Sequence, residues 1–132
     1  MKIENIKSIA VFCGSKNGKL AEYKVLALNV GVTLARKGIT LVYGGSRDGL
    51  MGIMANAALA EGGKVIGVMP EDRNWGEVTH EGLTELIKAK NMSKRKEIMS
   101  DRSDAAIALP GGYGTLDELF EFVTWTQLDI HN

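Results

Sequence analysis

The sequence predicts a single α/β domain with a Rossmann-like parallel sheet and helices on both faces of that sheet. Short apolar runs alternate with longer segments in which apolar residues recur at helical spacing. Glycine clusters follow the apolar runs directly, where the loops of such a sheet would bind a ligand. The 132 residues suffice for one domain with a core and not for two, so we take residues 1–132 as one domain.

The first strand and the first helix follow from two apolar patterns. Residues 9–13 form an apolar run, which predicts a strand. Apolar residues at spacings of three and four between Leu20 and Leu34 predict a helix, and Gly38 fits its end. Cys13 is interpreted as a small core residue. Ser15 is either a turn residue or a ligand contact at the carboxyl end of the strand.

A second strand is predicted at residues 39–43, followed by a glycine-rich loop that opens a helix. The loop, residues 44–52, lacks the G-x-G-x-x-G spacing of dinucleotide-binding folds and the Lys-Ser/Thr of a P-loop. Gly49 and Gly52 either serve a ligand or allow close packing of the helix on the sheet.

Residues 64–70 predict a third strand, which Pro70 closes. The polar segment 71–82 predicts a surface loop over the site and contains Glu77 and His80. We expect His80 to be solvated, as a lone loop histidine usually is, and no second His or Cys stands at metal-ligand spacing. A short strand is predicted at residues 84–89.

A helix is predicted from Met92 to about Ser103, with Ser93 as its N-cap. Arg95 and Lys96 fall in its first turn, where positive charge opposes the helix dipole. Local helix stability therefore does not explain these two residues, and an anionic ligand would. The alternative is an ordinary solvated basic face.

The last strand and its loop form the strongest candidate site. Residues 105–109 predict a buried parallel strand, and Pro110 ends it. Three glycines in residues 111–114 then precede a helix that opens at Thr115. A strand, a glycine loop and a helix in this order direct backbone N–H groups at an anion, usually a phosphate. Thr115 and Glu118 also fit a capping box, which is the purely structural alternative.

The composition argues against several classes of protein. The formal net charge is zero, which is atypical of a general nucleic-acid or anionic-membrane binder. The single cysteine excludes an intramolecular disulfide. Neither a secretory signal nor an apolar run long enough to span a bilayer is apparent. We expect a cytoplasmic protein without a nucleic-acid or membrane partner.

Four stretches carry a family resemblance: residues 11–15, residues 43–52, the Met92-x-x-Arg95-Lys96 motif and residues 110–118. Together they resemble the LONELY GUY (LOG) family of cytokinin riboside 5′-monophosphate phosphoribohydrolases, many of which carry the older label "possible lysine decarboxylase". The tail at residues 124–131 is similar as well, so the resemblance covers nearly the whole chain. The last motif together with Arg95-Lys96 is its most specific part.

The resemblance implies hydrolysis of the N-glycosidic bond of N6-modified AMP to a free base and ribose 5-phosphate. Arg95 and Glu118 match the catalytic pair of the family. The implied substrate-binding positions are Ser15, Gly45, Glu77, Met92, Lys96, Gly112, Tyr113, Gly114, Thr115, Leu116, Asp117 and Thr124. The resemblance implies no cofactor and no metal ion. It also implies a homodimer, to which a face with Phe122 and Trp125 could contribute.

The chemistry of these residues agrees with the implied reaction. Cleavage of a ribosyl C–N bond builds positive charge on the sugar. The Glu118 carboxylate would stabilise that charge and orient or deprotonate a water. Electrostatic help of this kind is worth about 3–4 kcal/mol per group. Arg95 would either fix the phosphate or contact the departing base.

The sequence departs from the family pattern in two places. A His-Glu or His-Gln pair commonly stands between the Met and the Arg of the third motif, and here it is Ser93-Lys94. Family chains usually continue with another strand and closing helices, which we expect to be missing here. Both departures motivate an alternative, a nucleotide-binding carrier or sensor without hydrolysis. Lysine decarboxylation is not favoured, because it normally needs pyridoxal phosphate held on a lysine.

Overall fold

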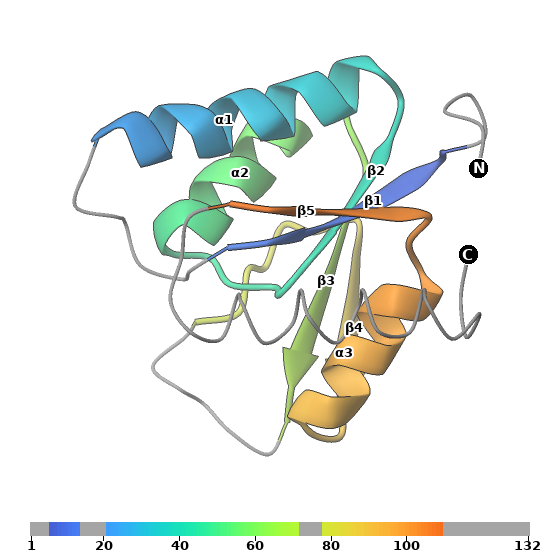
Figure 1. Ribbon diagram of the computed structural model, residues 1–132. Coiled ribbons are helices and arrows are strands. Elements are labelled where there is room, and N and C mark those ends of the chain that lie inside the picture. The colour runs from blue at the N-terminus through green and yellow to red at the C-terminus, as the bar shows by residue number, and fades with distance from the viewer. Residues whose placement is uncertain (1–5, 14–20, 72–77, 110–132) are drawn as a thin grey trace.

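A computed structural model describes residues 6–13, 21–71 and 78–109. The elements in these ranges are β1 (Ser8–Phe12), α1 (Ala21–Arg36), β2 (Thr40–Tyr43), α2 (Gly49–Ala60), β3 (Val65–Pro70), β4 (Glu85–Ala89), α3 (Met92–Asp101) and β5 (Ala105–Ala108). Figure 1 shows α1 and α2 on one face of the sheet and α3 on the other. The predicted α/β class and the predicted strands are confirmed, including the short strand β4.

The five strands form one sheet in the order β4-β3-β2-β1-β5, and every neighbouring pair is parallel. β1 lies between β2 and β5, at the point where the strand order reverses. Its residue Ile9 stands opposite Leu41 of β2 on one side and Ala105 of β5 on the other. From β1 the chain builds outward through β2, β3 and β4, and then crosses back to place β5 on the far side.

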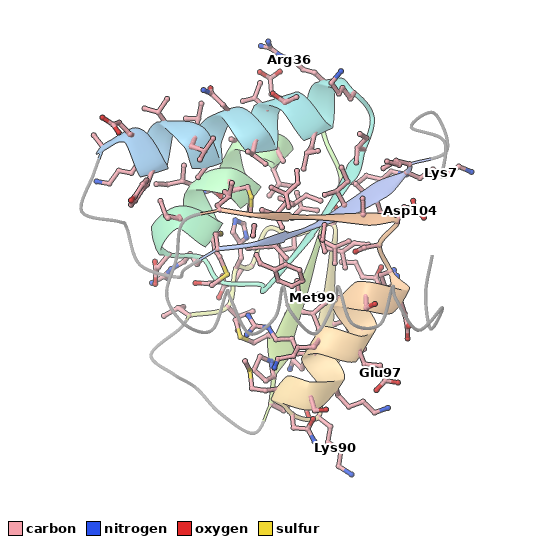
Figure 2. The ribbon with its side chains drawn as sticks, in the orientation of Figure 1. Lys7, Arg36, Lys90, Glu97, Met99 and Asp104 are labelled. Carbon is pink, nitrogen blue, oxygen red and sulfur yellow. The ribbon has the colours of Figure 1, made fainter. Side chains whose placement is uncertain are left out.

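Side chains alternate between the two faces of the sheet, as the strand period requires. On β1, Val11 joins the cluster under α1 and α2, while Ala10 and Phe12 join the cluster under α3. The first cluster is the larger and contains most of the buried residues of α2. Figure 2 shows Met99 pointing from α3 toward the sheet and Glu97 pointing away from it. The described sheet therefore has a packed core on each face.

The prediction of a buried strand at residues 105–109 is correct for its direction and wrong for its burial. β5 lies at the edge of the described sheet, where its first three residues are half-buried and Ala108 is exposed. Only Leu109, just past the strand, is buried, and its N–H donates to the Phe12 carbonyl at 2.8 Å. An apolar run of small residues fits a central strand and an edge strand equally well, so it did not predict the burial.

The helix ends show one confirmed prediction and one error. Gly38 follows α1 with a φ of 71°, a left-handed conformation that favours glycine at a helix end. The N-cap of α3, however, is Asn91 and not Ser93, because the Asn91 side chain accepts from the Lys94 N–H at 2.8 Å. Both residue types cap helices well, and only the observed backbone decides between them.

Candidate functional site

The strand order places a candidate site at the carboxyl edge of the sheet. In open α/β sheets, ligands bind beyond the carboxyl ends of the strands, at the point where the strand order reverses. Here that point lies between β1 and β5, which are neighbours in space although they lie at opposite ends of the described chain. The carboxyl ends of β2 and β3 lie next to it on one side.

The glycine-rich loop after β2 supplies the backbone of this edge. Gly45 has a φ of 86°, which a residue with a side chain rarely adopts. Gly44 needs to be glycine for a different reason, because a Cβ there would run into the guanidinium of Arg95. The two glycines therefore let the chain turn sharply and let a buried cation approach the main chain.

Arg95 is the charged residue that the fold buries at this edge. Its side chain reaches from α3 to β3 and to the loop after β2, and the residue is only 4% exposed. Nε donates to the carbonyl of Val68 at 2.9 Å, and an Nη donates to the carbonyl of Gly44 at 2.8 Å. The second Nη lies 3.5 Å from the sulfur of Met92. Such a fork of donors holds a guanidinium in one plane with a fixed direction.

The segment that follows the β3 loop is tied to the same glycine-rich loop. The Arg47 N–H donates to the Val78 carbonyl at 2.7 Å, and the His80 N–H donates to the Gly45 carbonyl at 2.9 Å. Ser46 and Thr79 form an antiparallel bridge between these two bonds. The glycine-rich loop is therefore held by α3 through Arg95 and by residues 78–80 through the main chain.

His80 corrects a prediction. We expected a solvated loop histidine, but the residue is only 9% exposed and both ring nitrogens have partners. Nδ1 accepts from the Gly82 N–H at 2.9 Å, and Nε2 lies 2.7 Å from Oδ1 of Asn56 on α2. The sequence gave no signal for this contact, since the two side chains stand 24 residues apart.

Tyr43 is another buried polar residue beneath the loop that the sequence analysis did not single out as a contact. Its hydroxyl donates to the Ser46 carbonyl at 2.8 Å. Burial, and to a smaller extent the neighbouring Cys13, raises the pKa of the phenol far above its usual range. The hydroxyl therefore stays protonated and keeps its role as a donor to the loop.

The structure brings together part of the predicted site. Gly45, Met92 and Arg95 gather at the carboxyl edge, and Lys96 follows Arg95 on α3 in a half-buried position. The other predicted site residues lie outside the described residues: Ser15, Glu77, Gly112, Tyr113, Gly114, Thr115, Leu116, Asp117, Glu118 and Thr124.

Two features are absent from the described residues. In residues 6–13, 21–71 and 78–109, no group of three or more His, Cys, Asp or Glu side chains is arranged to hold a metal ion. Within the same part of the chain, no helix has both the length and the apolar character needed to cross a bilayer.

Comparison with known families gives a match over most of the chain. The profile of the family described as "Possible lysine decarboxylase" matches residues 51–132. This range begins in α2 and includes α3 with Arg95. It also includes the motif at residues 110–118.

Three relatives with related names match the whole sequence closely. The chain is 50% identical over 127 residues to a cytokinin riboside 5′-monophosphate phosphoribohydrolase of Rhodococcoides fascians, covering 96% of this chain and 64% of that protein. Identity is 47% with an Arabidopsis thaliana protein of the same name, over 100% of this chain and 62% of that one. Identity is 48% with a probable cytokinin riboside 5′-monophosphate phosphoribohydrolase of Oryza sativa subsp. japonica, over 96% of this chain and 51% of that protein. The chain thus spans less than two thirds of the length of these relatives.

Solved structures with the same fold carry a different description. A molybdenum cofactor binding protein from Rippkaea orientalis superposes with a TM-score of 0.75 at 25% identity, over 89% of this chain and 71% of that chain. A Moco carrier protein from Chlamydomonas reinhardtii superposes with a TM-score of 0.76 at 25% identity, over 89% and 70%.

Proposed function

The chain belongs to the LONELY GUY family, whose profile is described as "Possible lysine decarboxylase", and we propose that it hydrolyses the N-glycosidic bond of a nucleoside 5′-monophosphate. The substrate is AMP or N6-modified AMP, and the products are a free base and ribose 5-phosphate. The names of relatives that are 47–50% identical support this reaction. We also propose that residues 1–132 act as one cytoplasmic nucleotide-binding domain.

The placement of Arg95 is the observation that carries this proposal. A guanidinium is costly to bury, and here two main-chain carbonyls accept its hydrogen bonds while Gly44 leaves room for it. Its position is the carboxyl edge of the sheet, where α/β folds bind nucleotides. A fixed positive charge there would attract the substrate phosphate or stabilise the departing base.

The proposed reaction assigns complementary roles to Arg95 and Glu118. As the C–N bond lengthens, the sugar gains positive charge, and the Glu118 carboxylate would stabilise it and orient or deprotonate the attacking water. The base leaves with the electron pair of the bond and takes up a proton. Met92, Lys96 and Gly45 are the proposed substrate contacts among the described residues.

Hydrolysis can be tested directly with AMP and isopentenyl-AMP, by chromatography of the released base. We expect base release by the wild-type chain and none by Glu118→Gln. Equal release from the two proteins, or none from either, would overturn the enzymatic proposal.

A nucleotide-binding carrier without hydrolysis is the second candidate function. It is favoured by the fold shared with proteins described as molybdenum cofactor carriers or binders. This candidate expects AMP to bind, as measured by calorimetry, without any turnover. Absence of nucleotide binding would count against both candidates.

We further propose that the chain forms a homodimer, as the family resemblance implies. Sedimentation at high protein concentration tests this point, and a monomer alone would contradict it.

A further inference from the structure

The two hydrogen bonds of the His80 ring distinguish between its two tautomers. A backbone N–H can only donate, so the bond from Gly82 requires Nδ1 to be an acceptor without a proton. The neutral imidazole then carries its proton on Nε2, which donates to Oδ1 of Asn56. The structure thus defines a neutral Nε2–H tautomer for a buried histidine that the proposed reaction does not use.

The contacts of His80 join two parts of the molecule that the sequence separates. Its main-chain N–H binds the carbonyl of Gly45, while its ring binds Asn56 on α2. Asn56 itself is an exposed residue of α2, and its Oδ1 faces the His80 ring at 2.7 Å. The His80–Asn56 pair therefore anchors residues 78–80 to a rigid helix.

The glycine-rich loop needs such an anchor. Two adjacent glycines can adopt many conformations, and neighbouring contacts must select one of them. The carbonyl of Gly44 is held by Arg95, and that of Gly45, the next residue, is held by His80. Release of the His80 ring would remove the tie between α2 and residues 78–80, the segment that binds the Gly45 carbonyl.

We propose that His80 is a positioning residue for nucleotide binding. As the neutral Nε2–H tautomer paired with Asn56, it fixes residues 78–80, and these fix the Gly45 turn at the carboxyl edge of the sheet. This role rests on the proposed function, because His80 would affect the affinity for a nucleoside monophosphate without contacting the reacting groups.

Two substitutions of His80 separate its two bonds. In His80→Gln the amide nitrogen reaches about as far as Nε2 and can still donate to Asn56, while water replaces the acceptor at the exposed Gly82. In His80→Asn the side-chain oxygen stands near Nδ1 and keeps the Gly82 bond, but the contact with Asn56 is lost. Asn56→Ala removes the same contact from the other side, and Glu81→Gln is an exposed control.

We expect His80→Asn and Asn56→Ala each to raise the KM or dissociation constant for AMP about tenfold or more, with kcat little changed. His80→Gln and Glu81→Gln should stay close to the wild-type value. The double substitution of His80→Asn and Asn56→Ala should be no worse than either alone. The proposal would be overturned if His80→Gln and His80→Asn lost AMP affinity equally, or if neither lost it. A fall in kcat at unchanged KM would also overturn it.

A nucleotide-independent measurement distinguishes failure of this inference from failure of the proposed function. The ring ¹⁵N shifts of His80 should report the Nε2–H tautomer, with His131→Gln used for assignment, since the sequence has only two histidines. The amides of Arg47 and His80 should be protected from hydrogen exchange in the wild type and in His80→Gln, and less protected in His80→Asn. An Nδ1–H tautomer or unprotected amides would refute the anchor. A wild type that has the tautomer and the protection but does not bind AMP would refute the proposed function, and with it the role in nucleotide binding.

Discussion

Helices α2 and α3 both follow a strand at the carboxyl edge of the sheet, but they are held in place by different forces. Half of the residues of α2 are buried, and all of these are apolar or glycine. Its N-cap Asp48 makes no side-chain capping bond. α3 buries only Arg95, Met99 and Ser100, and its N-terminus is capped by Asn91.

This difference separates the helix that contributes mainly to stability from the helix that carries the buried charged residue of the candidate site. Burial of apolar area places α2, whereas the glycine-rich loop before it is held by Arg95 and by residues 78–80. α3 lacks that apolar area and depends on directional polar bonds, the most buried of which belong to Arg95. Substitutions of the buried apolar residues of α2 should therefore affect stability alone, while substitutions of Arg95 should affect stability and nucleotide chemistry together.

Replacement of Arg95 by Ala should have the largest effect. The Gly44 and Val68 carbonyls would lose their donor, at about 1–3 kcal/mol for each buried group in the free energy of unfolding. Release of base from AMP should fall below detection. Urea denaturation and the hydrolysis assay measure the two effects. Lys94→Ala, an exposed neighbour on α3, is the control and should change stability by less than about 0.5 kcal/mol. Wild-type turnover in Arg95→Ala would contradict the role in nucleotide chemistry that we assign to Arg95 and not to α2.

Met54→Ala tests the α2 side of the comparison. Met54 is fully buried in the cluster under α1 and α2, and its truncation leaves a cavity that should cost about 2–4 kcal/mol. Calorimetry with AMP should nevertheless give the wild-type affinity at a temperature where the variant is folded. A large loss of affinity there would show that α2 takes a direct part in nucleotide binding.

Tyr43→Phe sharpens the comparison through its dependence on pH. Loss of the hydroxyl should cost about 1–3 kcal/mol, because the Ser46 carbonyl loses its donor. Since burial raises the pKa of Tyr43, the wild type keeps this contribution below the ordinary tyrosine pKa of about 10 and loses it as pH rises above that value. Denaturation midpoints between neutral and strongly alkaline pH should therefore fall more steeply for wild type than for Tyr43→Phe. Parallel curves would refute the assigned role of the phenol.

The smallest expected effect concerns the cap of α3. Asn91→Ala should lower the free energy of unfolding by about 1 kcal/mol, because the Lys94 N–H loses its acceptor. Ser93→Ala is the matched variant two residues along and should cost less than about 0.5 kcal/mol. Thermal unfolding of both proteins ranks them. A larger loss of stability in Ser93→Ala than in Asn91→Ala would indicate that Ser93 is the N-cap.

The sequence predicted those features that depend on local pattern. Apolar runs and helical spacing located every described strand and helix, because burial on a sheet or on one helix face leaves a periodic trace. Arg95 was also found, since a cation in a first helical turn contradicts the dipole. Its residue type and place in a motif were therefore visible without any coordinates.

Features that depend on the meeting of distant segments were not predicted. The acceptors of Arg95 are backbone carbonyls, which leave no mark on the sequence. The burial of His80 depends on Asn56, which belongs to another element and is an ordinary polar residue there. β5 was expected to be buried because alanine-rich runs do not record whether a strand has one neighbour or two.

The position of β1 between β2 and β5 also affects how the chain folds during synthesis. One edge of β1 stays unpaired until β5 has been made. The Asp104 carboxylate, 97 positions after Lys7, accepts from the N–H groups of Lys7 and Ser8 at 2.8 and 3.1 Å. Figure 2 shows Lys7 and Asp104 together at the amino ends of the strands. During synthesis the growing polypeptide must therefore carry an open, apolar strand edge until its last described strand emerges. Nascent chains of this fold should be strong clients for chaperones that shield such edges.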